Sequence, residues 1–344
     1  MRKLMTQLAP GLLLVFSLTA MAFGQNADAE AKADQIIKQA RAAIGDESKL
    51  KALQSLSATA SARQSFGERQ FESEVEVEIL MPDKIKRTTT NQFMTNTLAI
   101  NGTDLWNDRV MAVGGPGGGG PGGGPGGGGG MRGGFGGGGG GGNSPMAAYF
   151  QQQQRRELLQ LTLGWLLITP SSLSMKYSYV GEAQGPNGKV DVIDGATSDG
   201  IKTRLYIDQQ SHRLVGLSYK GKQLFRGPMG RGPGGPGAGR QEGGQRPPQA
   251  NAEGGGGQGQ RPQLSEEERE KRRKEAMEAF EKAPEVDYRW AFAEYKSVNG
   301  INLPHRLTKS EGGTPNEEWE ITKFKINPKL SADKFVKKEK EKNP

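Results

Sequence analysis

Two long tracts of the sequence cannot contribute to a packed core, and their positions limit how the rest of the chain folds. Residues 114–142 contain 23 glycines in 29 positions, and residues 227–263 are again rich in glycine and proline. Neither tract has enough apolar side chains to offset the entropy lost on ordering, so both are expected to be disordered loops. About 250 residues remain, enough for one domain with a real core. Because long loops add little closure entropy, the tracts are predicted to be insertions in a single domain, residues 25–344.

Alternation of polar and apolar residues predicts a series of antiparallel strands. Between Phe71 and Ile79, mostly apolar odd positions alternate with glutamates at the even positions, which is typical of a strand with one exposed face. Residues 201–207 alternate in the same way, and a polar turn then leads into a returning strand over 213–220. Further strands are expected at 54–65, 84–92, 97–101, 106–113, 174–181, 189–194, 288–292, 302–309 and 319–321. The prediction is an α+β fold dominated by one sheet.

Three helices accompany these strands. Residues 27–44 place Ala33, Ile36, Ile37, Ala40 and Ile44 on one stripe. Residues 146–168 pass from a polar first half into the nearly continuous apolar stretch Leu158–Ile168, which predicts burial on most sides. Residues 265–282 begin with Ser265 and Glu268 at capping-box spacing and are otherwise highly charged.

The first 24 residues have the three parts of a secretory signal. Arg2 and Lys3 precede an interrupted apolar run from Leu8 to Ala22, which ends in a small-x-small motif. This run is shorter than the ~20 apolar residues that span a bilayer. We predict cleavage after Ala22 or Gly24 and a soluble mature protein in the periplasm. Without any cysteine, the chain cannot be acylated on cysteine or form disulfides.

No motif indicates catalysis, a cofactor or a metal. His212 and His305 lie far apart, and each lies beside an arginine, as surface histidines often do. The acids between Asp191 and Asp208 fit turns and strand surfaces. Arg132 and Arg231 lie in Arg-Gly contexts that resemble RNA-binding segments, but their charge is too sparse to hold a phosphate backbone. Removing Arg2 and Lys3 lowers the formal net charge from +8 to +6, which requires no nucleic-acid partner. We therefore predict no enzyme activity, no cofactor and no nucleic acid.

The apolar faces of the strands leave two alternatives open. They form either an ordinary core or a hydrophobic hollow that binds lipid, because few helices are available to cover so much apolar surface.

Several stretches resemble the LolA/LolB-like superfamily of periplasmic lipoprotein carriers and receptors. They are Leu50–Ser57 followed by Val75–Lys84, then Ile100–Trp106, Leu205–Arg213, Val298–His305 and the closing Ser331–Phe335. This resemblance implies a strongly curved, half-open antiparallel sheet, an incomplete barrel, wrapped round a few helices, with an apolar hollow for acyl chains. The carriers have an Arg-Pro pair at the end of the second strand, where this chain has Met81-Pro82. The loss of that arginine argues against lipoprotein transfer in the family's manner and leaves lipid binding open.

From the residue patterns and the family resemblance together, we predict a periplasmic protein that binds or carries an acylated cargo, an outer-membrane lipoprotein or a lipid, without covalent chemistry. The Leu158–Ile168 helix is expected to act as a lid, and an inner- or outer-membrane protein is a further expected partner. An envelope sensor or interaction module with the same fold is the alternative, and a hydrolase using the Asp191–Asp208 acids is a more distant one. The residues predicted to line the apolar hollow are Val75, Val77, Ile79, Met81, Leu105, Trp106, Leu166, Trp290, Phe292, Trp319 and Ile321.

Overall fold

The computed structural model describes residues 24–66, 69–112, 145–170, 174–223 and 265–337. The predicted signal peptide up to residue 23, and the whole of both glycine-rich tracts, lie outside these residues. Those predictions therefore remain predictions.

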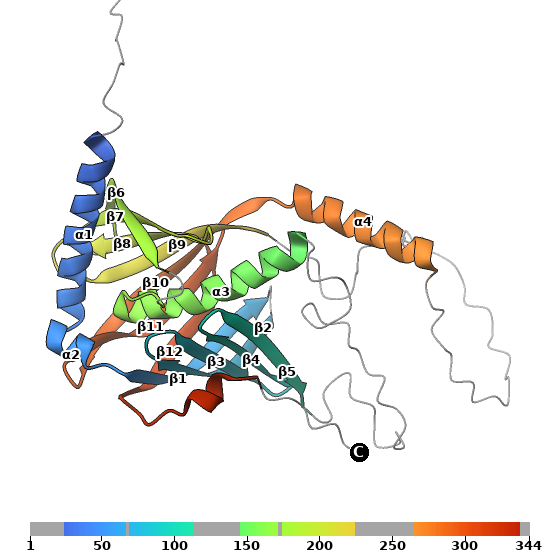
Figure 1. Ribbon diagram of the computed structural model, residues 1–344, viewed down its shortest axis with the longest axis horizontal. Helices are drawn as coiled ribbons and strands as arrows, with labels where there is room; N and C mark the ends of the chain where they lie inside the picture. The colour runs from blue at the N-terminus through green and yellow to red at the C-terminus, as the bar shows by residue number, and fades with distance from the viewer. Residues whose placement is uncertain (1–23, 67–68, 113–144, 171–173, 224–264, 338–344) are drawn as a thin grey trace, which may run out of the picture.

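Twelve antiparallel strands form one sheet in the described residues (Figure 1). The strand order is β5-β4-β3-β2-β1-β12-β11-β10-β9-β8-β7-β6, so β5 and β6 are its two edges. Among the described residues, the first and last strands in sequence order, β1 and β12, pair at the centre of the sheet, with Ala62 opposite Trp319. The strands are β1 (Ser55–Phe66), β2 (Arg69–Leu80), β3 (Lys84–Thr90), β4 (Met94–Asn101), β5 (Asp104–Met111), β6 (Met175–Gln184), β7 (Lys189–Thr197), β8 (Lys202–Asp208), β9 (Leu214–Lys222), β10 (Glu285–Val298), β11 (Ile301–Glu311) and β12 (Thr314–Ile326).

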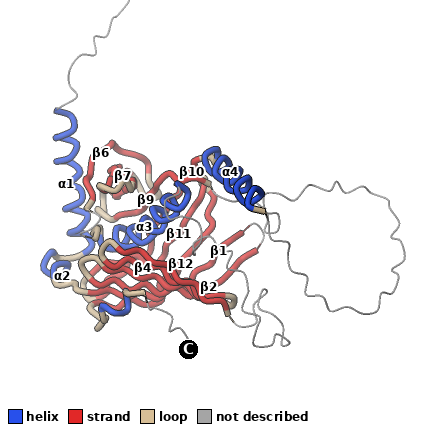
Figure 2. The backbone as a smooth tube through the Cα atoms, turned by 45° about the vertical axis from the view of Figure 1, so that its right-hand side comes forward, coloured by secondary structure: helices blue, strands red, loops and turns tan. Residues whose placement is uncertain are grey.

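The sheet is strongly curved around helix α3 (Pro145–Leu166), which lies inside it (Figure 2). β4 and β9 are seven places apart in the strand order, a separation of about 34 Å in a flat sheet with neighbours about 4.8 Å apart. However, residues of both strands line one cavity of about 320 Å³. The predicted α+β fold with a curved, half-open antiparallel sheet is confirmed: β5 and β6 do not pair with each other within the described residues.

The other helices differ in how far they join the core. Helix α1 (Gly24–Ile44) packs along the edge strand β6 and buries all five residues of its predicted stripe. The short α2 (Glu47–Lys51) leads into β1. Helix α4 (Glu266–Lys282) begins with the predicted capping box, in which the Ser265 side chain accepts from the Glu268 amide. It extends away from the sheet and buries only Phe280 (Figure 1).

The convex face of β2 to β5 is partly covered by the end of the chain, which the strand pattern does not predict. Glu78 belongs to the set of alternating glutamates expected to face water, but it is 3% exposed. Its carboxylate accepts from Lys334 at 2.6 Å and forms an ion pair with Lys86. Lys334 belongs to a short 3-10 helix, Ala332–Phe335, whose Phe335 side chain is fully buried. The prediction that this face of β2 is uniformly exposed is therefore wrong at Glu78.

Candidate functional site

The concave face of the sheet carries most of the residues predicted for the apolar hollow. Strand alternation brings the strand residues to one face. Helix α3 covers that face and contributes Leu166 to it. The buried apolar residues of this face and of α3 form one hydrophobic core cluster, and Met81 and Leu105 are partly buried against it. The eight that lie within it, each at most 5% exposed, are Val75, Val77, Ile79, Leu166, Trp290, Phe292, Trp319 and Ile321.

Trp106 is the exception and lies on the other side of the sheet. It follows Leu105 directly, and successive side chains of a strand point to opposite faces. Its indole Nε1 donates to the backbone carbonyl of Phe335 at 2.8 Å, on the convex face. The prediction that Trp106 lines the same hollow as Leu105 is therefore wrong.

The second half of α3 fills the concave face. Leu158, Leu163 and Trp165 are each 0% exposed, and the Trp165 ring packs edge-on against Phe324 at 5.4 Å. The helix comes so close to the sheet that a β-carbon on Gly164 would lie 2.5 Å from the Phe292 ring. Binding of a ligand to this surface stays a prediction, and it requires α3 to move.

The first half of α3 lies over a cavity of about 320 Å³, here called the central cavity. Gln153, Gln154 and Glu157 of α3 face side chains from β3, β4, β5, β9, β10 and β11. The strand residues include Arg87, Asn96, Asn107, Tyr219 and Lys309. None of the eleven residues predicted for the hollow lines this cavity.

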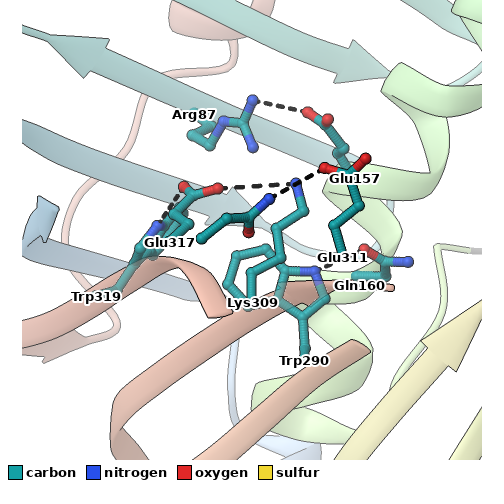
Figure 3. Close-up of polar contacts among 9 residues, drawn as sticks. Arg87, Glu157, Gln160, Trp290, Lys309, Glu311, Glu317 and Trp319 are labelled. Atoms are coloured by element: carbon teal, nitrogen blue, oxygen red, sulfur yellow. Dashed lines mark hydrogen bonds and ion pairs between the residues drawn. The ribbon is translucent and has the colours of Figure 1, made fainter. Parts of the chain in front are cut away.

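Charged pairs lie on the concave face beside the central cavity (Figure 3). Arg87 Nη2 lies 2.9 Å from Glu157 Oε2 and thereby joins β3 to α3. Lys309 Nζ lies 3.7 Å from Glu317 Oε2, and the Trp319 indole donates to Glu317 Oε1 at 2.6 Å. Where these polar groups meet the apolar second half of α3, Trp290 Nε1 donates to Gln160 Oε1 at 3.0 Å.

These contacts set the charge states of the buried groups. Burial alone would raise the pKa of Glu157, but Arg87 and Lys309 outweigh it and hold the pKa below its ordinary value. Burial alone would lower the pKa of Lys309, but Glu317 and Glu157 hold it above its ordinary value. Both groups are therefore charged at neutral pH.

A larger cavity of about 1550 Å³, here called the strand-end cavity, opens where β6 to β10 begin or end. Tyr219 lines both cavities. Its ring stacks on Tyr288 with centroids 5.1 Å apart, and the guanidinium of Arg156 lies 4.7 Å from its centroid. Burial raises the pKa of Tyr219 to about 12, so its hydroxyl is neutral.

These polar residues are not among those predicted from the sequence, although the sequence carries a signal for some of them. Arg87, Lys309 and Glu317 occupy positions of their strands that share a face with Ile85, Leu307 and Trp319. A charged residue at an inward position of an alternating strand is unusual, because burying a charge requires a partner. No comparable sequence signal distinguishes Arg156 from its neighbour Arg155.

The acids considered for hydrolysis have structural partners. Asp194 accepts hydrogen bonds from Nε and Nη2 of Arg204 at 2.6 and 2.9 Å, and Asp191 accepts one from Gln209 at 2.9 Å. Asp208 accepts from the Ser211 amide at 2.7 Å, and Asp199 accepts from Thr197. Within the described ranges, no three His, Asp or Glu side chains are grouped as a metal site. No helix among these residues combines the length and the apolarity needed to cross a bilayer.

Comparison with known proteins gives likeness in structure only. No family model and no curated protein matches the sequence. A putative outer membrane lipoprotein-sorting protein domain from Vibrio parahaemolyticus aligns over 89% of this chain and 97% of its own, with 9% identity and a TM-score of 0.41. A LolA superfamily protein from Nitrosomonas europaea aligns over 89% and 97%, with 7% identity and a TM-score of 0.39. A DUF1329 family protein from Desulfovibrio piger covers 88% and 97%, with 6% identity and a TM-score of 0.41. At such scores and identities, the likeness carries no argument about function.

Proposed function

We propose that the protein is a periplasmic binding protein that carries an acylated cargo, a lipoprotein or a lipid, on the concave face of its sheet. One observation carries the proposal: a single helix, α3, covers that apolar face, and the same helix continues over a polar cavity. An amphiphile has the same division into an apolar chain and a polar head. The mechanism is non-covalent and uses no cofactor.

Magnitudes indicate that α3 and an acyl chain can exchange places. Uncovering Leu158, Leu159, Leu163 and Leu166, all at most 1% exposed, costs about 1.5–3 kcal/mol for each side chain, or about 6–12 kcal/mol together. A bound chain of about 14 methylenes contributes about 11 kcal/mol at about 0.8 kcal/mol per CH₂. Because the two quantities are similar, the helix is expected to stay closed without cargo and to release cargo when another acceptor is near.

A tether that fixes α3 to the sheet tests this mechanism. The chain has no cysteine, so the variant Arg87→Cys/Glu157→Cys can be joined specifically by a short bis-maleimide. The joined protein is expected to lose binding of a fluorescent fatty acid, while the same variant before joining retains it. Lys189→Cys/Glu182→Cys is the matched control, because this 3.0 Å pair joins β6 to β7 and does not involve α3.

Two results would overturn the proposal. Equal fatty-acid binding by the tethered and untethered protein would mean that α3 does not open. Mass spectrometry of protein purified from its native envelope provides the second test, and the absence of any lipid there, together with no probe binding, would exclude the carrier function.

The exposed helix α4 favours a second candidate, an envelope sensor or interaction module. It is held to the body mainly at Phe280, whose ring packs against Tyr149 at 5.3 Å, and the rest of the helix is largely exposed. This candidate predicts a stoichiometric complex with an envelope protein that survives purification. Deleting residues 265–282 would abolish that complex and leave fatty-acid binding unchanged.

A further inference from the structure

Arg156 is a buried cation without a counter-ion among the residues that the structure describes. It lies on α3 and is 7% exposed, yet none of the described carboxylates forms an ion pair with it. Its Nη1 donates to the Gln153 side chain at 3.1 Å, and its guanidinium lies over the Tyr219 ring. Its Nε is buried without a hydrogen-bond partner among the described residues.

Such an arrangement is costly unless an anion completes it. A buried charge is ordinarily paired, and a guanidinium cannot escape the cost by losing its proton. Burial lowers the pKa of Arg156, and among the described groups the opposing contributions come from Tyr219 and Tyr149. Arg87, by contrast, has Glu157 at 2.9 Å on the same helix. The ring of Tyr219 offers cation–π attraction but no negative charge.

Arg156 lines the strand-end cavity, and the other charges there favour an anion. The lining side chains include six cations, counting Arg156, and four carboxylates. One of those carboxylates, Asp194, is already bound by Arg204 through two contacts. Lys176 and Lys202 are among the remaining cations, so the cavity has a net positive lining.

We propose that Arg156 is the receptor for an oxyanion, a carboxylate or a phosphate group, that enters the strand-end cavity. The planar fork of the guanidinium binds such groups through two parallel hydrogen bonds, and burial strengthens the contact. Tyr219 holds the guanidinium plane from one side. This site goes beyond the proposed carrier function, because it would bind a free anion as well as the anionic head of an amphiphile.

Calorimetric titration with three probes tests the site and distinguishes the sources of the anion. Inorganic phosphate and acetate represent free anions, and octanoate represents a carboxylate attached to an acyl chain. We expect the full-length protein to bind at least one probe, and Arg156→Met to weaken that binding at least tenfold. Arg155→Met is the matched control, because this neighbouring arginine bonds the Thr103 carbonyl at 2.6 Å and does not line the cavity.

Folding of the variant is checked separately. Removing an unpaired buried charge is expected to leave the urea midpoint without ligand unchanged or higher, whereas a purely structural role for Arg156 would lower it. Arg156→Lys, which keeps the charge and loses the fork, is expected to bind with intermediate affinity. If it binds no better than Arg156→Met, charge recognition is excluded and the proposal fails.

The outcomes separate this proposal from the carrier function. Failure of the wild type to bind any of the three probes, or equal binding by Arg156→Met, overturns the anion site and leaves the α3 tether experiment unaffected. Octanoate binding much tighter than acetate identifies an amphiphile as the source. Equal binding of acetate and octanoate, or a preference for phosphate, identifies a free anion.

Discussion

The two halves of helix α3 lie in opposite surroundings within one continuous element. From Leu158 to Leu166 every residue is buried, mostly among apolar side chains of the sheet. From Tyr149 to Glu157 the helix borders two cavities and contacts charged and polar groups. We predict from this difference that the second half contributes more to the stability of the fold than the first half does. Four substitutions test this prediction.

Trp165→Ala is expected to have the largest effect. The indole is fully buried against Phe324, and its Nε1 makes no hydrogen bond in the described structure, so the loss is one of packing. Truncation of such a side chain costs about 3–5 kcal/mol. Urea denaturation measures it, and a loss below about 1 kcal/mol would show that the second half of α3 is not a structural core.

Glu157→Gln is expected to cost about 1–2 kcal/mol at pH 7, because it leaves Arg87 without its charged partner. The folded-state pKa of Glu157 is lowered, so its stabilisation is present above the ordinary pKa and is lost as the pH falls through the folded value. Wild type and variant should therefore converge in acid. A difference that persists unchanged at pH 3, in urea unfolding at each pH, would argue against an ionic contribution.

Gly164→Ala is expected to destabilise by about 1 kcal/mol. Alanine is favoured over glycine in a helix by about 1 kcal/mol, but the new β-carbon would meet the Phe292 ring at 2.5 Å, and overpacking costs about 1–3 kcal/mol. Adding Phe292→Leu should reverse the sign and reveal the helix preference. If the effects of Gly164→Ala and Phe292→Leu on the free energy of unfolding were simply additive, steric contact between residue 164 and the Phe292 ring would be excluded as the cause.

Gln154→Ala is expected to have the smallest effect, within about 0.5 kcal/mol. The residue is half-buried and faces the central cavity, and alanine favours the helix. Thermal or urea unfolding provides the measurement. A large loss would mean that the first half of α3 is as essential to stability as the second, and the contrast between the halves would disappear.

Much of this fold could be predicted from alternation and helical stripes, because local periodicity reports which face of an element is covered. The helix over Gly24–Ile44 buries its five predicted residues, and the strand after Arg69 buries Val75, Val77 and Ile79. Glu78 could not be predicted as buried, since the residue that covers it, Lys334, is distant in sequence. Trp106, by contrast, could have been placed correctly from sequence, because neighbouring side chains of a strand point to opposite faces. The prediction grouped it with Leu105 on apolar character alone, whereas its indole bonds the Phe335 carbonyl on the convex face.

The site was less predictable than the fold. Arg87 and Lys309 are marked by their inward positions, but their partners Glu157 and Glu317 come from other elements, which only the assembled sheet brings near. Arg156 is buried by long-range curvature of the sheet, whereas Arg155 beside it is not. Sequence periodicity reports the covered face of a single element, and a cavity depends on several elements at once.

The pairing of β1 with β12 has a consequence for the order of assembly. Strands β1 to β5 are paired in sequence order, and so are β6 to β12, with α4 between β9 and β10; the two sets meet where β1 pairs with β12. Because the chain is synthesised from its amino terminus, it cannot complete the sheet until residues near Ile326 have been made. Until then, the inner faces of both sets are open, so folding is expected to be slow, as contacts of long sequence separation generally make it. The pairing of β1 with β12 therefore makes completion of the sheet depend on the last strand to be synthesised.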